Sequence, residues 1–216
     1  MSNTTDFEAV SKKFTEIYAT NHWHYGSGEG SLAELTEGYR DFLTAFIAKS
    51  GVRTVVDIGC GDWQFARLMD WSNVAYLGID VDQGLVDRNN AEYGRPNVKF
   101  VKMNVFNGPP PADLLICKDV MQHWTNAMIS QFAPFLPRYK YGLLTNCADP
   151  VARRNIDIEV GKFRPIDLTA EPFRLPVAKV YEFSGKTWRK ETHLWSRNFA
   201  QECAQFSSGF PIQKST

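Results

Sequence analysis

The chain lacks the features that mark several specialised classes of protein. Lys plus Arg and Asp plus Glu number 24 each among its 216 residues, so the formal net charge is zero and no overall positive field attracts nucleic acid. The four cysteines include no pair at the spacing of a zinc finger or a redox motif. No apolar stretch is long enough to cross a bilayer, and the first six residues lack the basic and apolar regions of a signal peptide. We therefore expect a soluble cytoplasmic protein, with buried free thiols at Cys117 and Cys147, where apolar runs end.

The most informative segment that the chain does contain is residues 53–62, an apolar run that leads into an acid and a Gly-x-Gly turn. The run is short and rich in β-branched residues, which is typical of a strand buried on both faces. Asp57 lies at its carboxyl end, where open α/β sheets bind their ligands. Gly59 and Gly61 let the backbone turn sharply and approach a ligand closely. This segment predicts a nucleoside-binding site.

Two details favour S-adenosylmethionine over a dinucleotide as that nucleoside. A dinucleotide site needs a third glycine three residues after the second, and Gln64 stands there. The carboxylate of Asp57 would repel a pyrophosphate but attract the ammonium or sulfonium group of S-adenosylmethionine. The pattern Asp57-x-Gly59-x-Gly61 resembles the first motif of class I S-adenosylmethionine-dependent methyltransferases. The loop departs from the commonest form of that motif at Trp63, where the family usually has another glycine.

Two further polar residues follow the next predicted strands. Asp80 ends the second strand about 20 residues after the glycine turn, where a carboxylate can accept both ribose hydroxyls; its alternative role is to cap the next helix. Asn104 follows the third strand at the place where the resembled family contacts adenine, and it is equally well explained as a turn residue. Both residues support a nucleoside ligand without specifying the reaction.

Residues 113–124, a strand and the loop after it, also resemble the methyltransferase family, and the resemblance spans about residues 25 to 195 in all. It implies S-adenosylmethionine as the cofactor and a set of cofactor-binding residues: Tyr25, Ser27, Asp57, Gly59, Cys60, Gly61, Trp63, Asp80, Val81, Asn104, Val105 and Lys118. No metal site is predicted among them.

Strand and helix patterns alternate through the middle of the chain, which predicts a mostly parallel sheet with helices on both faces. The periodicity and capping signals predict helices over 7–18, from Ser31 to Lys49, from Asp82 to about 94, and from Thr125 to Phe135. The strands are expected near 55–58, 74–80, 98–101, 113–117 and 141–145, with a final antiparallel hairpin of 179–183 and 187–195. This is the α/β three-layer architecture, with a seven-stranded sheet, of the resembled family.

The expected division of the chain follows from the same pattern. Residues 1–50 would form N-terminal helices and a loop covering the site, and 51–197 the methyltransferase core. Residues 149–177 would be an insertion in that core, and 198–216 a C-terminal extension.

Methyl transfer to an alcohol requires alignment of the acceptor and removal of its proton. His123 has the intrinsic pKa of a general base near neutral pH, and Asp119 would orient it, stabilise its charge or act as the base itself. The alternative is that His123 is a hydrogen-bonded residue that merely lines a pocket. A metal-assisted variant would use Asp119, Asn146 and Asp149 to hold Mg²⁺.

The acceptor is expected to be a small molecule or a glycan, bound by segments outside the core. Arg40, Arg164 and Asp167 are the predicted acceptor-binding residues, and Trp23, Trp188 and Trp195 would stack on sugar faces or pack in the core. The loop 26–31 and residues 164–169 resemble small bacterial methyltransferases, some of them associated with sugar modification, which implies O-methylation of a sugar hydroxyl.

Three further functions remain open from the sequence. Methylation of a nucleic-acid base is disfavoured because residues 118–121 lack the family's Pro-Pro-aromatic run, and Pro109–Pro111 lie before the strand instead of after it. A nicotinamide oxidoreductase is disfavoured by Gln64. Nothing in the sequence excludes a protein that binds S-adenosylmethionine without catalysis.

Overall fold

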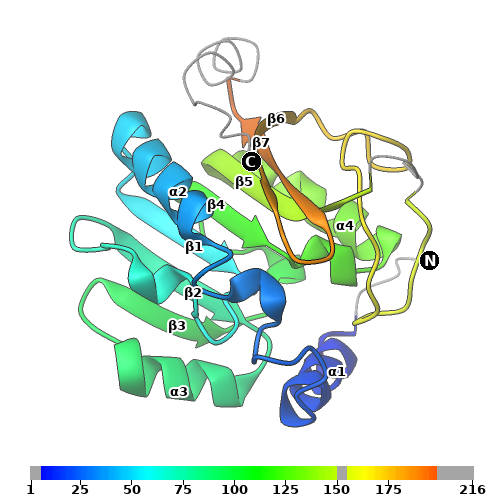
Figure 1. Cartoon of the computed structure of the whole chain (residues 1–216), viewed down its shortest axis with the longest axis horizontal. Coiled ribbons are helices and arrows are strands. Elements are labelled where there is room, and N and C mark those ends of the chain that lie inside the picture. The colour runs from blue at the N-terminus through cyan, green and yellow to red at the C-terminus, as the bar shows by residue number, and fades with distance from the viewer. Residues whose placement is uncertain (1–5, 150–154, 199–216) are drawn as a thin grey trace.

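A single twisted sheet of seven strands organises the protein. The computed structural model describes residues 6–149 and 155–198, and its strands lie in the order β3-β2-β1-β4-β5-β7-β6 (Figure 1). The first five are parallel, and β7 runs antiparallel to both β5 and β6. The strands are β1 Thr54–Ile58, β2 Ala75–Asp80, β3 Val98–Lys102, β4 Ala112–Lys118, β5 Tyr139–Ala148, β6 Ala178–Ser184 and β7 Arg189–Ser196. The α/β architecture with a closing hairpin, expected from the alternation of patterns, is confirmed.

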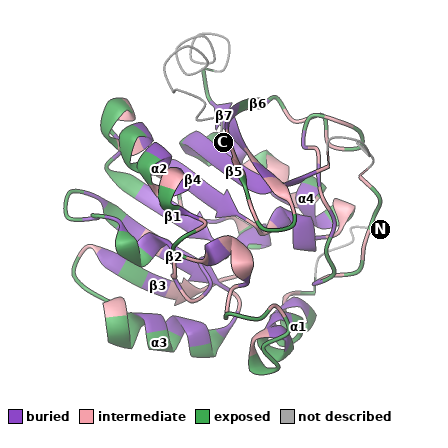
Figure 2. Cartoon of the chain, viewed as in Figure 1, coloured by how far each residue is buried: buried purple, intermediate pink, exposed green. Residues whose placement is uncertain are grey.

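Helices cover both faces of this sheet and give two apolar cores. Helix α2 (Glu37–Ser50) packs on one face, while α1 (Phe7–Ala19) and α4 (Asn126–Phe132) contribute to the core on the other. Helix α3 (Gln83–Tyr93) packs against β2 and β3 at the sheet edge. The central strands are buried along almost their whole length, and the outer faces of the helices are exposed (Figure 2). This arrangement leaves the carboxyl ends of β1, β2 and β4 at one edge, which is where the site is built.

Helix boundaries differ from the sequence prediction in two places. The predicted capping box at Ser31 is wrong, because Ser31 closes a short 3-10 turn (Glu29–Ser31) and α2 begins only at Glu37. In that turn the amide of Ser31 donates to the carbonyl of Gly28. The predicted end of α2 is confirmed, since Gly51 adopts a left-handed conformation (φ 62°) at the C-cap.

The helix expected from Thr125 to Phe135 starts as predicted but ends earlier. The Thr125 hydroxyl accepts the amide of Met128 and caps the first turn. The α-helix stops at Phe132, and the chain continues as a 3-10 helix through Arg138, past Pro137. Pro134 has no amide hydrogen to donate to the preceding turn, so the α-helical ladder breaks there.

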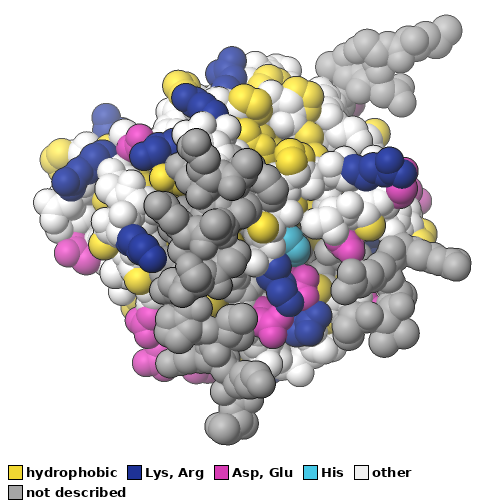
Figure 3. All heavy atoms as spheres, turned by 90° about the horizontal axis from the view of Figure 1, so that it is seen from above, with side chains coloured by type: hydrophobic (Ala, Val, Ile, Leu, Met, Phe, Trp, Pro, Cys, Tyr) yellow, Lys and Arg dark blue, Asp and Glu magenta, His cyan; other side chains and the backbone are white. Residues whose placement is uncertain are grey.

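The described part of the surface and the described cysteines are as the composition predicted. Ion pairs on the β6–β7 hairpin join Lys179 to Glu182 and Arg189 to Glu191, and acidic and basic side chains lie side by side over the described part of the face in Figure 3. The three described cysteines, at 60, 117 and 147, are buried free thiols, while Cys203 and the expected extension from 199 onward lie outside the described residues. In residues 6–149 and 155–198, none of the helices has the length and apolar character that a bilayer span requires.

Candidate cofactor and acceptor site

A pocket opens at the carboxyl ends of β1, β2 and β4, with about 880 Å³ of empty space, part of it open to solvent. Helix α1 and the loop after it form an apolar roof, to which Phe14 and Trp23 contribute. The Ser11 hydroxyl of α1 donates to the carbonyl of Val81 at 2.8 Å, and the Thr15 hydroxyl donates to Asp82 at 2.6 Å. These bonds fasten the roof helix to the end of β2.

The glycine turn after β1 forms the floor of the pocket and tolerates no side chain at either glycine. Gly59 and Gly61 have φ of 69° and 55°, where other residues are strained. A Cβ on Gly59 would lie 2.3 Å from the side chain of Val120, and one on Gly61 would lie 2.2 Å from the hydroxyl of Ser27. The glycines therefore let the loops at 27 and 120 close on the turn, and Gly59 also lines the pocket.

Trp63 lies below this turn and faces the core. Its φ is 58°, the left-handed conformation that explains why the resembled family usually has glycine here. The indole is buried beside Tyr76, Tyr93 and Phe100, with ring centroids 5.2 to 5.5 Å away. Burial in this aromatic cluster offsets the backbone strain. Trp63 is not among the residues that line the pocket, so its role as a cofactor contact stays a prediction.

Asp57 lines the pocket from β1 and is 2% exposed. Burial raises the pKa of its carboxyl from 3.8 to about 7, against the lowering effects of a hydrogen bond from Tyr76 and the charge of Lys118. The Tyr76 hydroxyl donates to Asp57 Oδ2 at 2.5 Å. The carboxyl is therefore poised to ionise when a cation is placed beside it. Tyr76 was missed in the sequence because its contact crosses from the neighbouring strand.

Asp80, at the end of β2, is a buried acceptor in the same pocket. Its Oδ1 accepts the amides of Val81 and Asp82, and its Oδ2 accepts the amide of Gly61 at 3.0 Å. These bonds lower the pKa of the carboxyl, but burial outweighs them and raises it. The alternative role as helix cap is wrong, since Asp82 caps α3 by accepting the amide of Leu85. Asp80 instead ties the glycine turn to β2 and keeps lone pairs available for a ligand.

Asn104 lines the pocket after β3, and it also fulfils its alternative role as a turn residue. Its Oδ1 accepts the amide of Phe106 and caps a short 3-10 helix, Val105–Asn107. The oxygen is therefore engaged, and the Nδ2 group is the part of the side chain suited to donate to a ligand. Val81 and Val105 line the same part of the pocket with apolar surface.

A buried ion cluster of Lys118, Asp119 and Lys190 borders the pocket. Asp119 accepts from Lys118 Nζ at 2.5 Å and from Lys190 Nζ at 2.6 Å, in a left-handed conformation with φ of 60°. Burial alone would raise the pKa of Asp119, but the two ammonium groups outweigh it and hold the pKa well below its usual range. Both carboxylate oxygens are thus engaged, and neither bonds to His123. Asp119 anchors the loop after β4, and its lowered pKa makes it a weak base.

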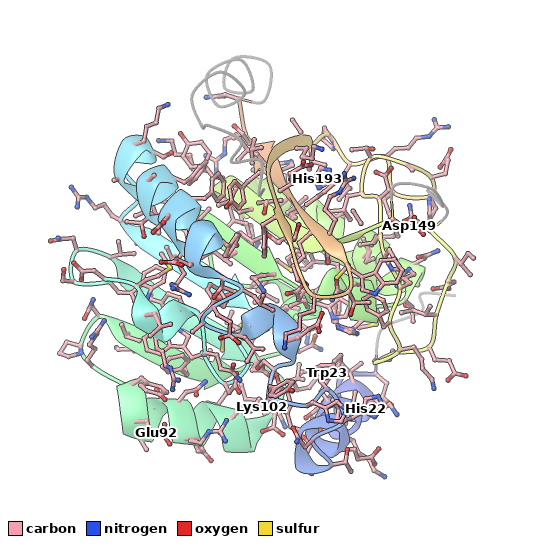
Figure 4. The ribbon with its side chains drawn as sticks, in the orientation of Figure 1. His22, Trp23, Glu92, Lys102, Asp149 and His193 are labelled. Carbon is pink, nitrogen blue, oxygen red and sulfur yellow. The ribbon has the colours of Figure 1, made fainter. Side chains whose placement is uncertain are left out.

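The residues proposed for a metal-assisted reaction are also engaged within the protein. Asn146 Oδ1 accepts the amide of Gln122 at 3.2 Å, and Asp119 is held by its two lysines. Asp149 follows β5 and is labelled in Figure 4. Among the described residues, no three His, Cys, Asp or Glu side chains gather closely enough to form a metal site.

His123 lies at the end of a 3-10 turn (Met121–His123) and lines the pocket beside Trp23, with ring centroids 4.9 Å apart. Nδ1 lies 2.9 Å from the carbonyl of Lys162, which can only accept, so Nδ1 carries the proton. Burial lowers the pKa of the imidazole to about 4, so the ring is neutral at pH 7. Nε2 then has a lone pair, and among the described residues its one hydrogen-bond contact is a long one, 3.4 Å from the Gln122 amide. Geometrically, His123 can accept a proton from a bound hydroxyl.

A strap of residues 161–164, within the expected insertion, holds this histidine in place. Gly161 and Arg164 donate their amides to the carbonyls of His123 and Gln122, at 3.0 and 3.2 Å. The Arg164 guanidinium is buried and donates to the carbonyl of Trp124 and to Asn126. Arg164 thus fastens the strap to the segment that follows His123, and it is not among the pocket-lining residues.

The remaining predicted residues divide between the pocket and the surface. Ser27, Cys60 and Lys118 line the pocket as expected. Four others do not line it: Gly61 donates its amide to Asp80, Tyr25 is 59% exposed, Arg40 donates to the carbonyl of Ala33, and Asp167 accepts the amide of Thr169. Their ligand contacts stay predictions. Lys190 joins the ion cluster from β7. The sequence analysis missed it, because the alternating pattern of a strand does not show that a lysine pairs with a residue 71 positions away.

Comparisons with known proteins agree with this fold and pocket. A family model described as a methyltransferase domain matches residues 56–133. Cephaeline 6'-O-methyltransferase IpeOMT1 of Carapichea ipecacuanha is 23% identical over 125 residues, which are 52% of this chain. The match covers 35% of that relative, so the chain corresponds to about a third of its length.

Two solved structures have the same fold at low sequence identity. Magnesium protoporphyrin IX methyltransferase of Synechocystis PCC 6803, with bound SAH, superposes with a TM-score of 0.60 at 16% identity, over 88% of this chain and 98% of that one. Mitomycin 7-O-methyltransferase MmcR has a TM-score of 0.62 at 13% identity, over 90% of this chain and 62% of that one. Residues 56–133, which include the glycine turn and both acids, thus match a methyltransferase domain, and the chain shares the Rossmann-like fold of these two methyltransferases.

Proposed function

We propose that the chain transfers a methyl group from S-adenosylmethionine to a hydroxyl of a small acceptor, a sugar or another hydroxylated molecule, with His123 as general base. The observation that carries this proposal is the position of His123 Nε2, unprotonated in the same pocket as Asp57 and Asp80. The matched methyltransferase domain and the O-methyltransferase relative support the reaction class.

The pocket is lined by polar and apolar groups that suit the chemistry of the cofactor. Asp80 has lone pairs left for the ribose hydroxyls, and Asn104 Nδ2 is available to donate to adenine, between the apolar surfaces of Val81 and Val105. Asp57 attracts the ammonium group, because a nearby cation favours its ionised form. When bound, the cofactor supplies a methyl group already activated by the positive sulfur.

The protein's remaining task is to align the acceptor and take its proton. The hydrogen bond to Lys162 fixes the tautomer and orientation of His123, so that Nε2 can face the acceptor oxygen. The ion cluster positions the loop that carries His123, since Asp119 at the start of that loop is held by lysines from β4 and β7. The apolar roof formed by α1 excludes water from the reacting atoms.

The test is a pair of measurements on wild type and His123→Gln. We expect both proteins to be stabilised by S-adenosylmethionine in a thermal-shift assay, because His123 contributes to the acceptor step. Radiolabelled methyl transfer to a panel of hydroxylated acceptors should fall about 100-fold or more in the variant, the usual contribution of a general base. A fully active variant would remove His123 as the base, and stabilisation by NAD alone would replace the proposal with an oxidoreductase.

The same assays distinguish a metal-assisted reaction from cofactor binding without catalysis. Activity that a chelator abolishes and Mg²⁺ restores would support the metal-assisted reaction. Binding of S-adenosylmethionine with no transfer to any acceptor would support a non-catalytic binding protein.

A further inference from the structure

A row of aromatic rings leads from the pocket to the surface. Trp23, His123, Phe163 and Trp188 follow one another, with successive ring centroids 4.9, 6.0 and 5.7 Å apart. Phe163 is 41% exposed, and Trp23 and Trp188 are half-buried. We call Trp23, Phe163 and Trp188 the aromatic ledge. Its rings come from the loop after α1, the strap and the β6–β7 turn, three segments outside the sheet core.

The ledge is held against the loop after β4 that carries Gln122 and His123. The residues on both sides of Phe163 bond to that loop: the Lys162 carbonyl accepts from His123, and Arg164 donates its amide to Gln122. Trp23 is fixed by an edge contact with Tyr18, at 5.5 Å, and a tilted contact with Phe14, at 5.9 Å. Phe163 and Trp188 are neighbours and neither is fully buried, so together they form a contiguous apolar patch, the kind of surface that marks ligand-binding sites.

The ledge is continuous with the pocket. Trp23 and His123 line the pocket and also begin the row, so a molecule resting on the outer rings would reach His123 at its inner end. The third candidate tryptophan, Trp195, is buried in the core and plays no part.

We propose that the aromatic ledge binds the planar ring of a phenol-type acceptor and directs its hydroxyl to His123 Nε2; this inference rests on the proposed methyl transfer. Aromatic faces pair with other aromatic rings at centroid distances of about 4.5 to 7 Å, the range already found along the row. In the reaction, the phenolic oxygen forms its bond to the methyl carbon as the carbon–sulfur bond breaks. The phenolic proton passes to His123 Nε2, and the products are an aryl methyl ether and S-adenosylhomocysteine.

Two observations favour a phenol over a sugar. A sugar presents hydroxyls around its rim that need hydrogen-bonding partners, whereas the ledge offers ring faces and few polar atoms. His123 is also a weak base, because burial lowers its pKa to about 4. A phenol, with a pKa of about 10 as in tyrosine, loses its proton to such a base far more readily than an aliphatic hydroxyl, whose pKa is nearer to that of water, roughly 16.

The test measures binding and turnover on the whole chain with 2-naphthol as the phenol and methyl glucoside as the sugar. Calorimetry of 2-naphthol binding to protein saturated with S-adenosylhomocysteine should show Kd raised about tenfold in Phe163→Ala and in Trp188→Ala. Ile156→Ala is the matched control, since Ile156 lies in the same insertion, is 69% exposed and makes no ring contact with the ledge. It should bind 2-naphthol as wild type does. Turnover of 2-naphthol should show a raised KM and a nearly unchanged kcat in both ledge variants.

The outcomes separate this inference from the proposed function. Equal 2-naphthol affinity in wild type and both ledge variants overturns the ledge, even if methyl transfer takes place. Turnover of methyl glucoside but not of 2-naphthol, with KM sensitive to Phe163, overturns the acceptor class. Stabilisation by S-adenosylhomocysteine in all variants shows that they fold and keep the cofactor site, whereas its absence in wild type contradicts the proposed function itself.

Discussion

The buried carboxyl of Asp57 predicts an unusual dependence of stability on pH. Burial raises its pKa from 3.8 to about 7 in the folded protein. Between these values the folded state holds a proton that the unfolded chain has lost, so the free energy of unfolding falls as pH rises. The contribution is complete below pH 3.8, is lost progressively up to about pH 7, and amounts to about 4 kcal/mol, from about three pKa units at 1.36 kcal/mol each.

Asp57→Asn removes this titration and keeps the shape of the side chain, since the Tyr76 hydroxyl can donate to the amide oxygen. We expect the free energy of unfolding of wild type, minus that of the variant, to fall by about 2.5 kcal/mol between about pH 5 and pH 8. Urea unfolding of both proteins at several pH values in this range measures the difference. A difference in the free energy of unfolding that stayed constant with pH would reflect only how the amide side chain packs.

Tyr76→Phe provides the matched control for this prediction. The Tyr76 hydrogen bond lowers the pKa of Asp57, so its loss should extend the fall in stability to higher pH. Parallel stability curves for wild type and Asp57→Asn would mean that Asp57 ionises normally in the folded protein, contrary to this prediction.

Three further predictions concern the cofactor, the ion cluster and the glycine turn. Wild type should bind S-adenosylmethionine more tightly as pH rises from about 6 to 8, because its positive charge favours ionised Asp57, and calorimetry should find this dependence lost in Asp57→Asn. Lys190→Met should lower Tm by about 4 to 10 °C, since it removes a buried charge-assisted hydrogen bond at 2.6 Å from Asp119; an unchanged Tm would contradict that role. Gly61→Ala should destabilise the protein by more than about 1 kcal/mol and weaken cofactor binding, because its Cβ would lie 2.2 Å from the Ser27 hydroxyl. Gly51→Ala is the control: Gly51 is also left-handed but has open space around it, so this variant measures the cost of the backbone strain without the clash.

The parts of the fold that the sequence predicted are those fixed by local patterns. The strand ending at Asp57 and the cap at Thr125 follow from runs and signals within a few residues, and both are present. The helix predicted to start at Ser31 was wrong because the same Ser-x-x-Glu pattern is compatible with a 3-10 turn. Tertiary contacts decide between them, and here Ser31 closes over the pocket.

The site was predictable where a motif places a residue at a strand end, as for Asp57 and Asp80. It was not predictable where function depends on contacts between distant strands. Lys190 meets Asp119 from β7, and Arg164 meets Trp124 from the insertion, so the first was missed and the second was assigned to the acceptor. A charged side chain in a sequence does not indicate whether it will be buried against a partner or exposed to a ligand.

The central claim is that the pocket between β1, β2 and β4 binds S-adenosylmethionine through Asp57 and Asp80. Calorimetric titration of wild type and Asp80→Asn with S-adenosylmethionine and with NAD tests it most directly, since Asn keeps an acceptor for the amide of Gly61 while losing the charge. We predict one S-adenosylmethionine bound per chain, an affinity at least about tenfold weaker in Asp80→Asn, and no binding of NAD. Equal affinity of both proteins for S-adenosylmethionine, or binding of NAD in its place, would contradict the account.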